Sequence, residues 1–148
     1  MTKSRSRKFD RKRLENVREE SKGLSIRNLL TFSFKDFDQS QPKKSPETLK
    51  IWSDKGLLPK LFDRLKHLAN LTRSEAINEG QLKEYGKFPD KDKTEFFIPA
   101  HVPSGANWTV IKKLGGKVRV VGYVLQNTFY IVFLDSEHRF YFSKKKHT

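Results

Sequence analysis

The last third of the chain has the hydrophobic pattern of a β-sheet. Four segments rich in Val, Ile, Tyr and Phe are separated by short turns. They cover residues 108–114, 117–125, 128–135 and 138–143. Two-residue hairpin loops favour residues that accept a positive φ, which suits Gly115-Gly116 and Gln126-Asn127, and Ser136-Glu137 provides a third turn. The pattern therefore predicts an antiparallel meander of four strands.

A strand and a helical pair are predicted ahead of the meander. Apolar and polar residues alternate over residues 29–37, as in a half-buried strand. Apolar residues then recur at helical spacing. They are Leu49, Trp52, Leu57, Leu61, Leu65 and Leu68. Because proline is tolerated in the first turn of a helix, we expect a helix of about two turns from Pro46 and a longer helix from near Pro59.

The segment between the helical pair and the meander is less regular. Residues 72–75, Thr-Arg-Ser-Glu, fit a capping box, which predicts a short helix that ends by Gly80. Glycines and prolines surround a charged stretch in residues 81–105, which we expect to form a long surface loop anchored by residues 96–98. Together, these elements predict an α+β fold with an N-terminal strand, a helical pair and an antiparallel β-meander packed on the helices.

Two-residue loops would fix which residues of the meander face one another, because each residue gains a neighbour by counting outward from the turn. The pairs are Trp108 with Tyr123, Tyr123 with Tyr130, Lys112 with Arg119, and Arg119 with Leu134. One face then carries the apolar side chains that should pack on the helices. These are Ile111, Val118, Val120, Val124, Phe129, Ile131, Phe133, Phe140 and Phe142. The other face carries Trp108, Lys112, Lys117, Arg119, Tyr123, Tyr130, Arg139 and Tyr141.

Charge makes this second face a candidate binding surface. The 148 residues include 31 Lys and Arg against 17 Asp and Glu, and a net charge of +14 indicates a surface for a polyanion. Lys112 and Arg119 repel each other when directly opposite, and a bound phosphate would relieve that repulsion. Neighbouring aromatic rings can stack on bases, so the face is predicted to bind single-stranded nucleic acid, RNA above all. An ordinary solvated sheet face could show the same residues.

Basic residues also gather at both ends of the chain. Residues 1–23 are rich in Lys and Arg with few apolar side chains, which predicts a flexible arm on a single domain over residues 24–148. We expect contacts to nucleic acid from the second face and from the basic C-terminus. The expected residues are Trp108, Lys113, Lys117, Tyr123, Tyr130, Lys144, Lys145 and Lys146.

Several kinds of site have no signature in the sequence. There is no cysteine, the four histidines lack metal-binding spacing, and no phosphate-binding glycine motif is present. We therefore expect neither a metal nor a cofactor. An apolar run long enough for a membrane span is missing, as is the apolar stretch of a secretory signal. These features predict a cytoplasmic protein without membrane association.

The residues of the second face could also perform chemistry. RNA can be cleaved without a metal when a base, cations and an acid surround the phosphate. Arg119 and Arg139 could stabilise the pentavalent phosphate, and Lys112 could assist them or act as a base. Tyr141 or His138 could move the proton, although His138 fits a turn residue equally well. Both arginines should be solvated, so their truncation should change stability by no more than about 0.5 kcal/mol.

One run of residues resembles a known family. Residues 114–123, Leu-Gly-Gly-Lys-Val-Arg-Val-Val-Gly-Tyr, are followed by an apolar strand at 129–135 and by His138-Arg139. This run resembles the glycine-led RVxY strand and the hydrophobic strand of the RelE/ParE superfamily of bacterial toxins. The order of elements over residues 29–146 is similar as well, which implies a RelE/ParE-like fold.

The resemblance implies a ribosome-dependent endonuclease that cleaves mRNA in the decoding site and is neutralised by a small acidic antitoxin protein. By motif position, Arg119 matches the arginine of the central strand, and Lys112 and Lys113 match the basic residues of the preceding strand. Arg139 and Tyr141 match the C-terminal catalytic group. Some members inhibit gyrase and cleave nothing. A ribonuclease, a non-catalytic module for single-stranded nucleic acid or ribosomal RNA, and a gyrase-directed toxin therefore remain open.

Overall fold

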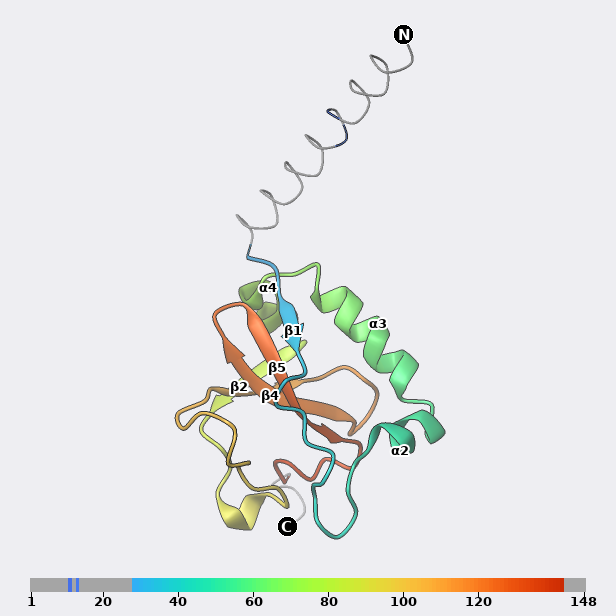
Figure 1. Cartoon of the computed structure of the whole chain (residues 1–148), viewed down its shortest axis with the longest axis vertical. Helices are drawn as coiled ribbons and strands as arrows, with labels where there is room; N and C mark the ends of the chain where they lie inside the picture. The colour runs from blue at the N-terminus through green and yellow to red at the C-terminus, as the bar shows by residue number, and fades with distance from the viewer. Residues whose placement is uncertain (1–10, 12, 14–27, 143–148) are drawn as a thin grey trace.

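The structure, a computed structural model, describes residues 28–142 together with Arg11 and Arg13 (Figure 1). The described chain has an α+β fold with a five-stranded mixed sheet and three α-helices, so the predicted class is confirmed. The strands are β1 (Thr31–Ser33), β2 (Leu82–Gly86), β3 (Trp108–Ile111), β4 (Arg119–Leu125) and β5 (Thr128–Asp135). The helices are α2 (Leu49–Asp54), α3 (Leu58–Leu68) and α4 (Arg73–Asn78), with a 3-10 turn, η1, at Lys91–Lys93. Apart from Arg11 and Arg13, the predicted arm lies outside the described residues.

Each helix begins where the sequence supplies a start signal. The Thr48 hydroxyl accepts a hydrogen bond from the Ile51 N–H at the start of α2, and Pro59 lies in the first turn of α3. At α4, Thr72 and Glu75 form the reciprocal hydrogen bonds of a capping box. The helical pair and the short third helix are therefore confirmed.

The sheet has the order β1-β5-β4-β3-β2, and only the β1–β5 pair is parallel. Two predictions are wrong. Residues 82–86, expected in a loop, form the edge strand β2 beside β3. Residues 138–142, expected to be part of a fourth meander strand, are irregular. The reason is that β1 occupies the free edge of β5, while Asp135 accepts hydrogen bonds from the Arg139 and Phe140 N–H groups and turns the chain out of the sheet.

One face of the sheet packs on the helices and forms the larger core (Figure 1). The helices contribute Trp52, Leu61, Leu65, Leu68 and Ala76, and the strands contribute Leu82, Ile111, Val120, Val124, Phe129, Ile131 and Leu134. Most of the side chains predicted for this face are confirmed, including the half-buried Val118. Phe133 and Phe140 are the exceptions, because both belong to the opposite face. The Phe142 N–H bonds to the Lys93 carbonyl outside the sheet.

A β-bulge in β5 explains the displacement of Phe133. Tyr123 faces Tyr130 as predicted and Gly122 faces Ile131, but the next pair is Val121 with Phe133. The extra residue reverses the faces that follow it, so Phe133 turns away from the helices. For the same reason Arg119 faces Asp135 and not the predicted Leu134, which joins the helical core.

The face away from the helices is covered. Irregular segments at residues 87–106 and 136–142 fold over it and supply a second apolar core. They contribute Phe88, Phe96, Val102, Ala106, Phe140 and Tyr141. Trp108 is 2 % exposed and Tyr123 is 4 % exposed, so the expectation of an open aromatic face is wrong at its centre. The physical reason is that the apolar side chains of both segments become buried against this face. The sequence pattern of each segment does not predict where in the fold it packs.

Candidate catalytic and nucleic-acid-binding site

One end of the covered face stays accessible at the start of β4. A small hollow there is lined by Tyr85, Val110, Arg119, Asp135, His138, Phe140 and Tyr141. Its volume of about 10 Å³ is enough for roughly one water molecule, so a larger ligand would lie across its mouth. The structure thus brings together three of the predicted catalytic residues from separate segments. We call this site the Arg119 hollow.

Arg119 is the first residue of β4, and the turn before that strand fixes its guanidinium group. Nη1 donates hydrogen bonds to the carbonyl oxygens of Gly116 at 2.8 Å and Val118 at 2.9 Å. Lys112 directly follows Ile111, whose partner across β3 and β4 is Val120, so Lys112 and Arg119 leave neighbouring strand ends as predicted. Arg119 therefore lines the hollow with a guanidinium group held by backbone carbonyls, and Lys112 lies at the neighbouring strand end.

Asp135 shapes the loop that carries His138. It is 1 % exposed, and its two carboxylate oxygens accept the N–H groups of Arg139 and Phe140, each at 2.9 Å. Burial raises the pKa of Asp135, the two N–H groups and His138 oppose the shift, and Glu47 adds to it. His138 has a φ of 57° at the tip of this loop, and its half-buried imidazole has no hydrogen bond within residues 28–142. The imidazole is therefore available to a ligand.

Tyr141 reaches the hollow by stacking on a residue that the sequence pattern missed. Its ring lies 4.9 Å from the ring of Tyr85, with 16° between the planes. Lys83 lies two residues before Tyr85 on β2, and its Nζ is 4.9 Å from the centre of the Tyr85 ring. Both residues come from β2, a strand within the segment that its glycines, prolines and charged residues predict as a loop. Aromatic and basic side chains were predicted for the whole face, and at the end with the Arg119 hollow they are present.

Arg139 does not join the hollow. Its Nη2 donates to Glu47 Oε2 at 2.9 Å and to the Ser45 carbonyl at 3.1 Å, and its Nη1 donates to the Ser45 hydroxyl. The Arg139 side chain is only 15 % exposed, and that of Glu47 is 3 % exposed. Glu47 also accepts from the Trp52 indole and from Ser136. The expectation that Arg139 is a solvated cation is wrong, because it neutralises a buried carboxylate.

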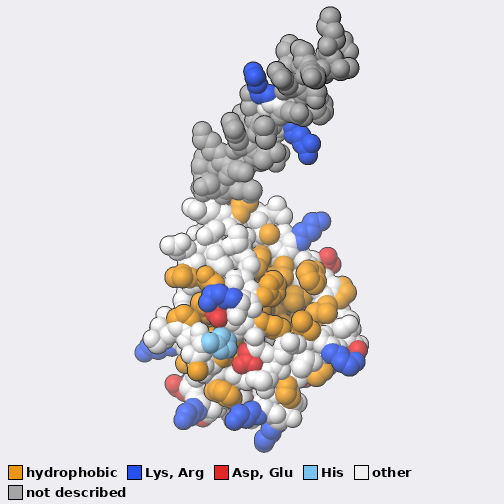
Figure 2. All heavy atoms as spheres, viewed as in Figure 1, with side chains coloured by type: hydrophobic (Ala, Val, Ile, Leu, Met, Phe, Trp, Pro, Cys, Tyr) orange, Lys and Arg blue, Asp and Glu red, His pale blue; other side chains and the backbone are white. Residues whose placement is uncertain are grey.

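The remaining predicted binding residues are dispersed. Trp108 and Tyr123 are buried, and the Tyr123 hydroxyl donates to Asp36; burial, and then this contact, raise the pKa of Tyr123. Tyr130 is half-buried, with its ring 4.6 Å from that of Tyr123. Lys113 and Lys117 are exposed, and Lys117 pairs with Glu137. Lys144, Lys145 and Lys146 lie outside the described residues. In the view of Figure 2, Lys and Arg side chains are scattered over the surface.

Among residues 28–142, Arg11 and Arg13, no group of three or more potential His, Asp or Glu ligands could hold a metal ion. Nor does any helix among these residues have the length and apolarity to cross a bilayer. No protein-family model, curated protein or solved structure matches this chain.

Proposed function

We propose that this protein is a metal-free, RelE/ParE-like endoribonuclease that cleaves mRNA on the ribosome and is restrained by a small acidic antitoxin protein. The convergence of Arg119, His138 and Tyr141 on one hollow is the observation that supports the proposal most strongly. These three side chains are a cation, an imidazole and a phenol, which are the types needed for proton transfer and charge stabilisation at a phosphate.

The proposed reaction takes place at the mouth of the hollow. His138 takes the proton from the 2′-hydroxyl, whose oxygen attacks the neighbouring phosphorus. Arg119, with Lys112 beside it, stabilises the negative charge of the pentavalent phosphate. Tyr141 donates a proton to the departing 5′-oxygen while its ring stays stacked on Tyr85. The products are a cyclic 2′,3′-phosphate and a free 5′-hydroxyl, so no external reactant is required.

A second candidate function is a binding module that uses the same cations without catalysis. Its support is the way Arg119 is held, because Nη1 is already occupied by two loop carbonyls and the hollow itself is small. A cation fixed in this way can position a phosphate from outside without entering a reaction. The two functions differ in whether His138 and Tyr141 exchange protons.

Three single variants test the choice. Arg119→Ala, His138→Gln and Tyr141→Phe are compared with wild type for RNA cleavage on purified ribosomes and for growth arrest on induction. His67→Gln is the matched control, because His67 is exposed on α3 and pairs with Glu79. Removal of a preorganised charge or proton donor should lower the cleavage rate about a hundredfold, whereas the control should cleave normally. If His138→Gln and Tyr141→Phe keep full activity while Arg119→Ala loses RNA binding, the binding module is the correct function.

A further inference from the structure

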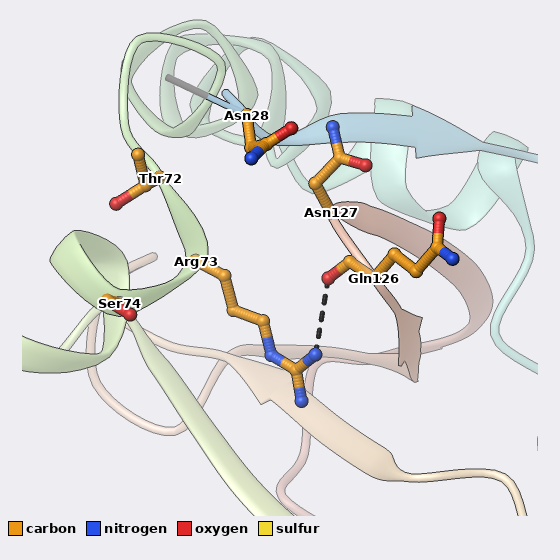
Figure 3. Close-up of a pocket in the computed structure, with 6 residues that line it drawn as sticks. All are labelled: Asn28, Thr72, Arg73, Ser74, Gln126 and Asn127. Carbon is orange, nitrogen blue, oxygen red and sulfur yellow. Dashed lines mark hydrogen bonds between the residues drawn. The ribbon is translucent and has the colours of Figure 1, made fainter. Parts of the chain in front are cut away.

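A polar hollow lies at the other end of β4 from the Arg119 hollow. Its volume is about 560 Å³, which is within the range of ligand sites in proteins. It is lined by Asn28, Thr72, Arg73, Ser74, Gln126 and Asn127. Figure 3 shows Thr72 and Ser74 on one side and the three amide residues on the other, with Arg73 reaching across between them. We call it the amide hollow, since none of its lining side chains is apolar or acidic.

Several polar groups of the amide hollow are free to bind a ligand. Asn28, Gln126 and Ser74 are exposed, and within residues 28–142 their side chains make no hydrogen bond. Asn127 donates its Nδ2 to the Leu29 carbonyl at 2.8 Å, which fixes its amide at the rim. An amide presents a donor and an acceptor side by side, and a hydroxyl can be either. These amide and hydroxyl groups suit a ligand whose edge carries alternating hydrogen-bond donors and acceptors.

Arg73 does not make the amide hollow a phosphate site. Its Nε and Nη2 donate to the two carboxylate oxygens of Glu84, at 2.6 and 3.0 Å, and its Nη1 donates to the Gln126 carbonyl at 3.2 Å. The guanidinium is thus paired with a carboxylate, and the hydrogen bond from Arg73 lowers the pKa of Glu84. A ligand in the hollow meets a fixed neutral pair, which suits an uncharged polar group better than an anion.

Asn28, which lines the amide hollow, directly follows a strongly basic segment of the chain. Residues 1–27 directly precede Asn28 and contain ten Lys and Arg against four Asp and Glu. Cations of this density attract a nucleic-acid backbone regardless of its sequence. A base attached to such a backbone would be delivered to the place where this segment joins the domain.

We propose that the amide hollow binds a nucleobase of single-stranded RNA. Amide side chains pair well with base edges, because both carry a donor next to an acceptor. This inference rests on the proposed function only for the identity of the ligand as RNA. It adds a second contact at the opposite end of β4 that recognises a base and performs no chemistry.

The test compares RNA with and without bases on the full-length protein. The probes are fluorescein-labelled 2′-O-methyl RNA of about ten nucleotides, a length typical of single-strand sites, and an abasic strand of equal phosphate number. The 2′-O-methyl group prevents cleavage through the 2′-oxygen, so only binding is measured. Ser74→Trp should fill the amide hollow, and Ser53→Trp, at an exposed serine of α2, is the matched control.

Wild type and Ser53→Trp should bind the base-bearing strand about tenfold more tightly than the abasic strand, a difference of about 1.4 kcal/mol. Ser74→Trp should lose this preference and keep its affinity for the abasic strand. The double variant Asn28→Ala, Ser74→Ala removes polar groups without adding bulk and should also lose the preference, which covers the case that the tryptophan disturbs folding. Equal preference in all four proteins would overturn the proposed base site alone. A wild-type protein that binds neither strand would overturn the proposed function as well.

Discussion

Arg119 and Arg139 have the same side chain and were predicted to lie on the same face, but their surroundings give them different roles. Arg119 is held by two turn carbonyls at the mouth of a hollow, where its charge remains available to a ligand. Arg139 is paired with Glu47, a carboxylate buried among Trp52 and Ser136. A cation that neutralises a buried carboxylate contributes to folding and not to binding.

Arg139→Ala should therefore be strongly destabilising. It would leave the Glu47 carboxylate buried without its cation, and breaking a buried ion pair costs about 3 to 5 kcal/mol. Denaturant unfolding measures this loss, and Lys113→Ala is the control because an exposed lysine should change stability by less than about 0.5 kcal/mol. An Arg139→Ala protein as stable as the control would contradict the structural role. Loss of activity in this variant would then be evidence for catalysis.

At the scale of elements, the bulge in β5 determines which side chains reach the candidate site. Gly122 borders the bulge, and a Cβ there would lie 1.9 Å from the Tyr130 carbonyl oxygen and 2.8 Å from the Phe129 ring. Only glycine therefore allows β4 and β5 to approach so closely beside the extra residue of β5. Phe133 then packs on Phe96 and Trp108, and Asp135 faces Arg119 beside the hollow.

Gly122→Ala should force β4 and β5 apart. Overpacking of a core costs about 1 to 3 kcal/mol, and we expect a loss near the upper end because the obstructing atom belongs to the backbone. Leu125→Ala is the control on the same strand, since Leu125 is 61 % exposed and its truncation should change stability by less than about 0.5 kcal/mol. Thermal unfolding of both variants measures the difference. Equal stability would mean that the close approach at Gly122 is relieved without cost.

On the scale of the whole molecule, the positive charge is unevenly distributed along the chain. Residues 28–142 carry 18 Lys and Arg against 13 Asp and Glu, a net of +5 out of the total of +14. The larger share of the surplus therefore lies in the two ends. The described domain contributes a few cations at defined positions, such as Arg119 and Lys112. The two ends contribute most of the net positive charge.

RNA affinity should accordingly depend steeply on salt, chiefly because of the ends. Each phosphate contact with a single strand contributes about −0.7 to the slope of log affinity against log salt concentration. Deleting residues 1–22 should make this slope shallower without abolishing growth arrest, because both core clusters lie within residues 30–141. Titrations of both proteins across a salt series measure the slopes. An affinity that stays flat between low and moderate salt would contradict electrostatic binding.

Features that depend on residues close together along the chain could be predicted from the sequence. The helix starts near Pro59 and after Thr72 follow from proline and the capping box, whereas the first helix begins after Thr48 and not at the predicted Pro46. The β3–β4 register follows from short-range counting around Gly115 and Gly116. The positions of Lys112 and Arg119 at neighbouring strand ends were predictable for the same reason.

Which faces and edges of the sheet are covered could not be predicted in this way, because coverage depends on contacts between segments far apart in the sequence. β1 takes the edge of β5 that the meander was predicted to extend, and residues 87–106 bury Trp108 and Tyr123. A salt bridge spanning 92 residues removes Arg139 from the site. The candidate site is what remains accessible after these long-range contacts form, so His138 and Tyr141 meet Arg119 only in the folded chain.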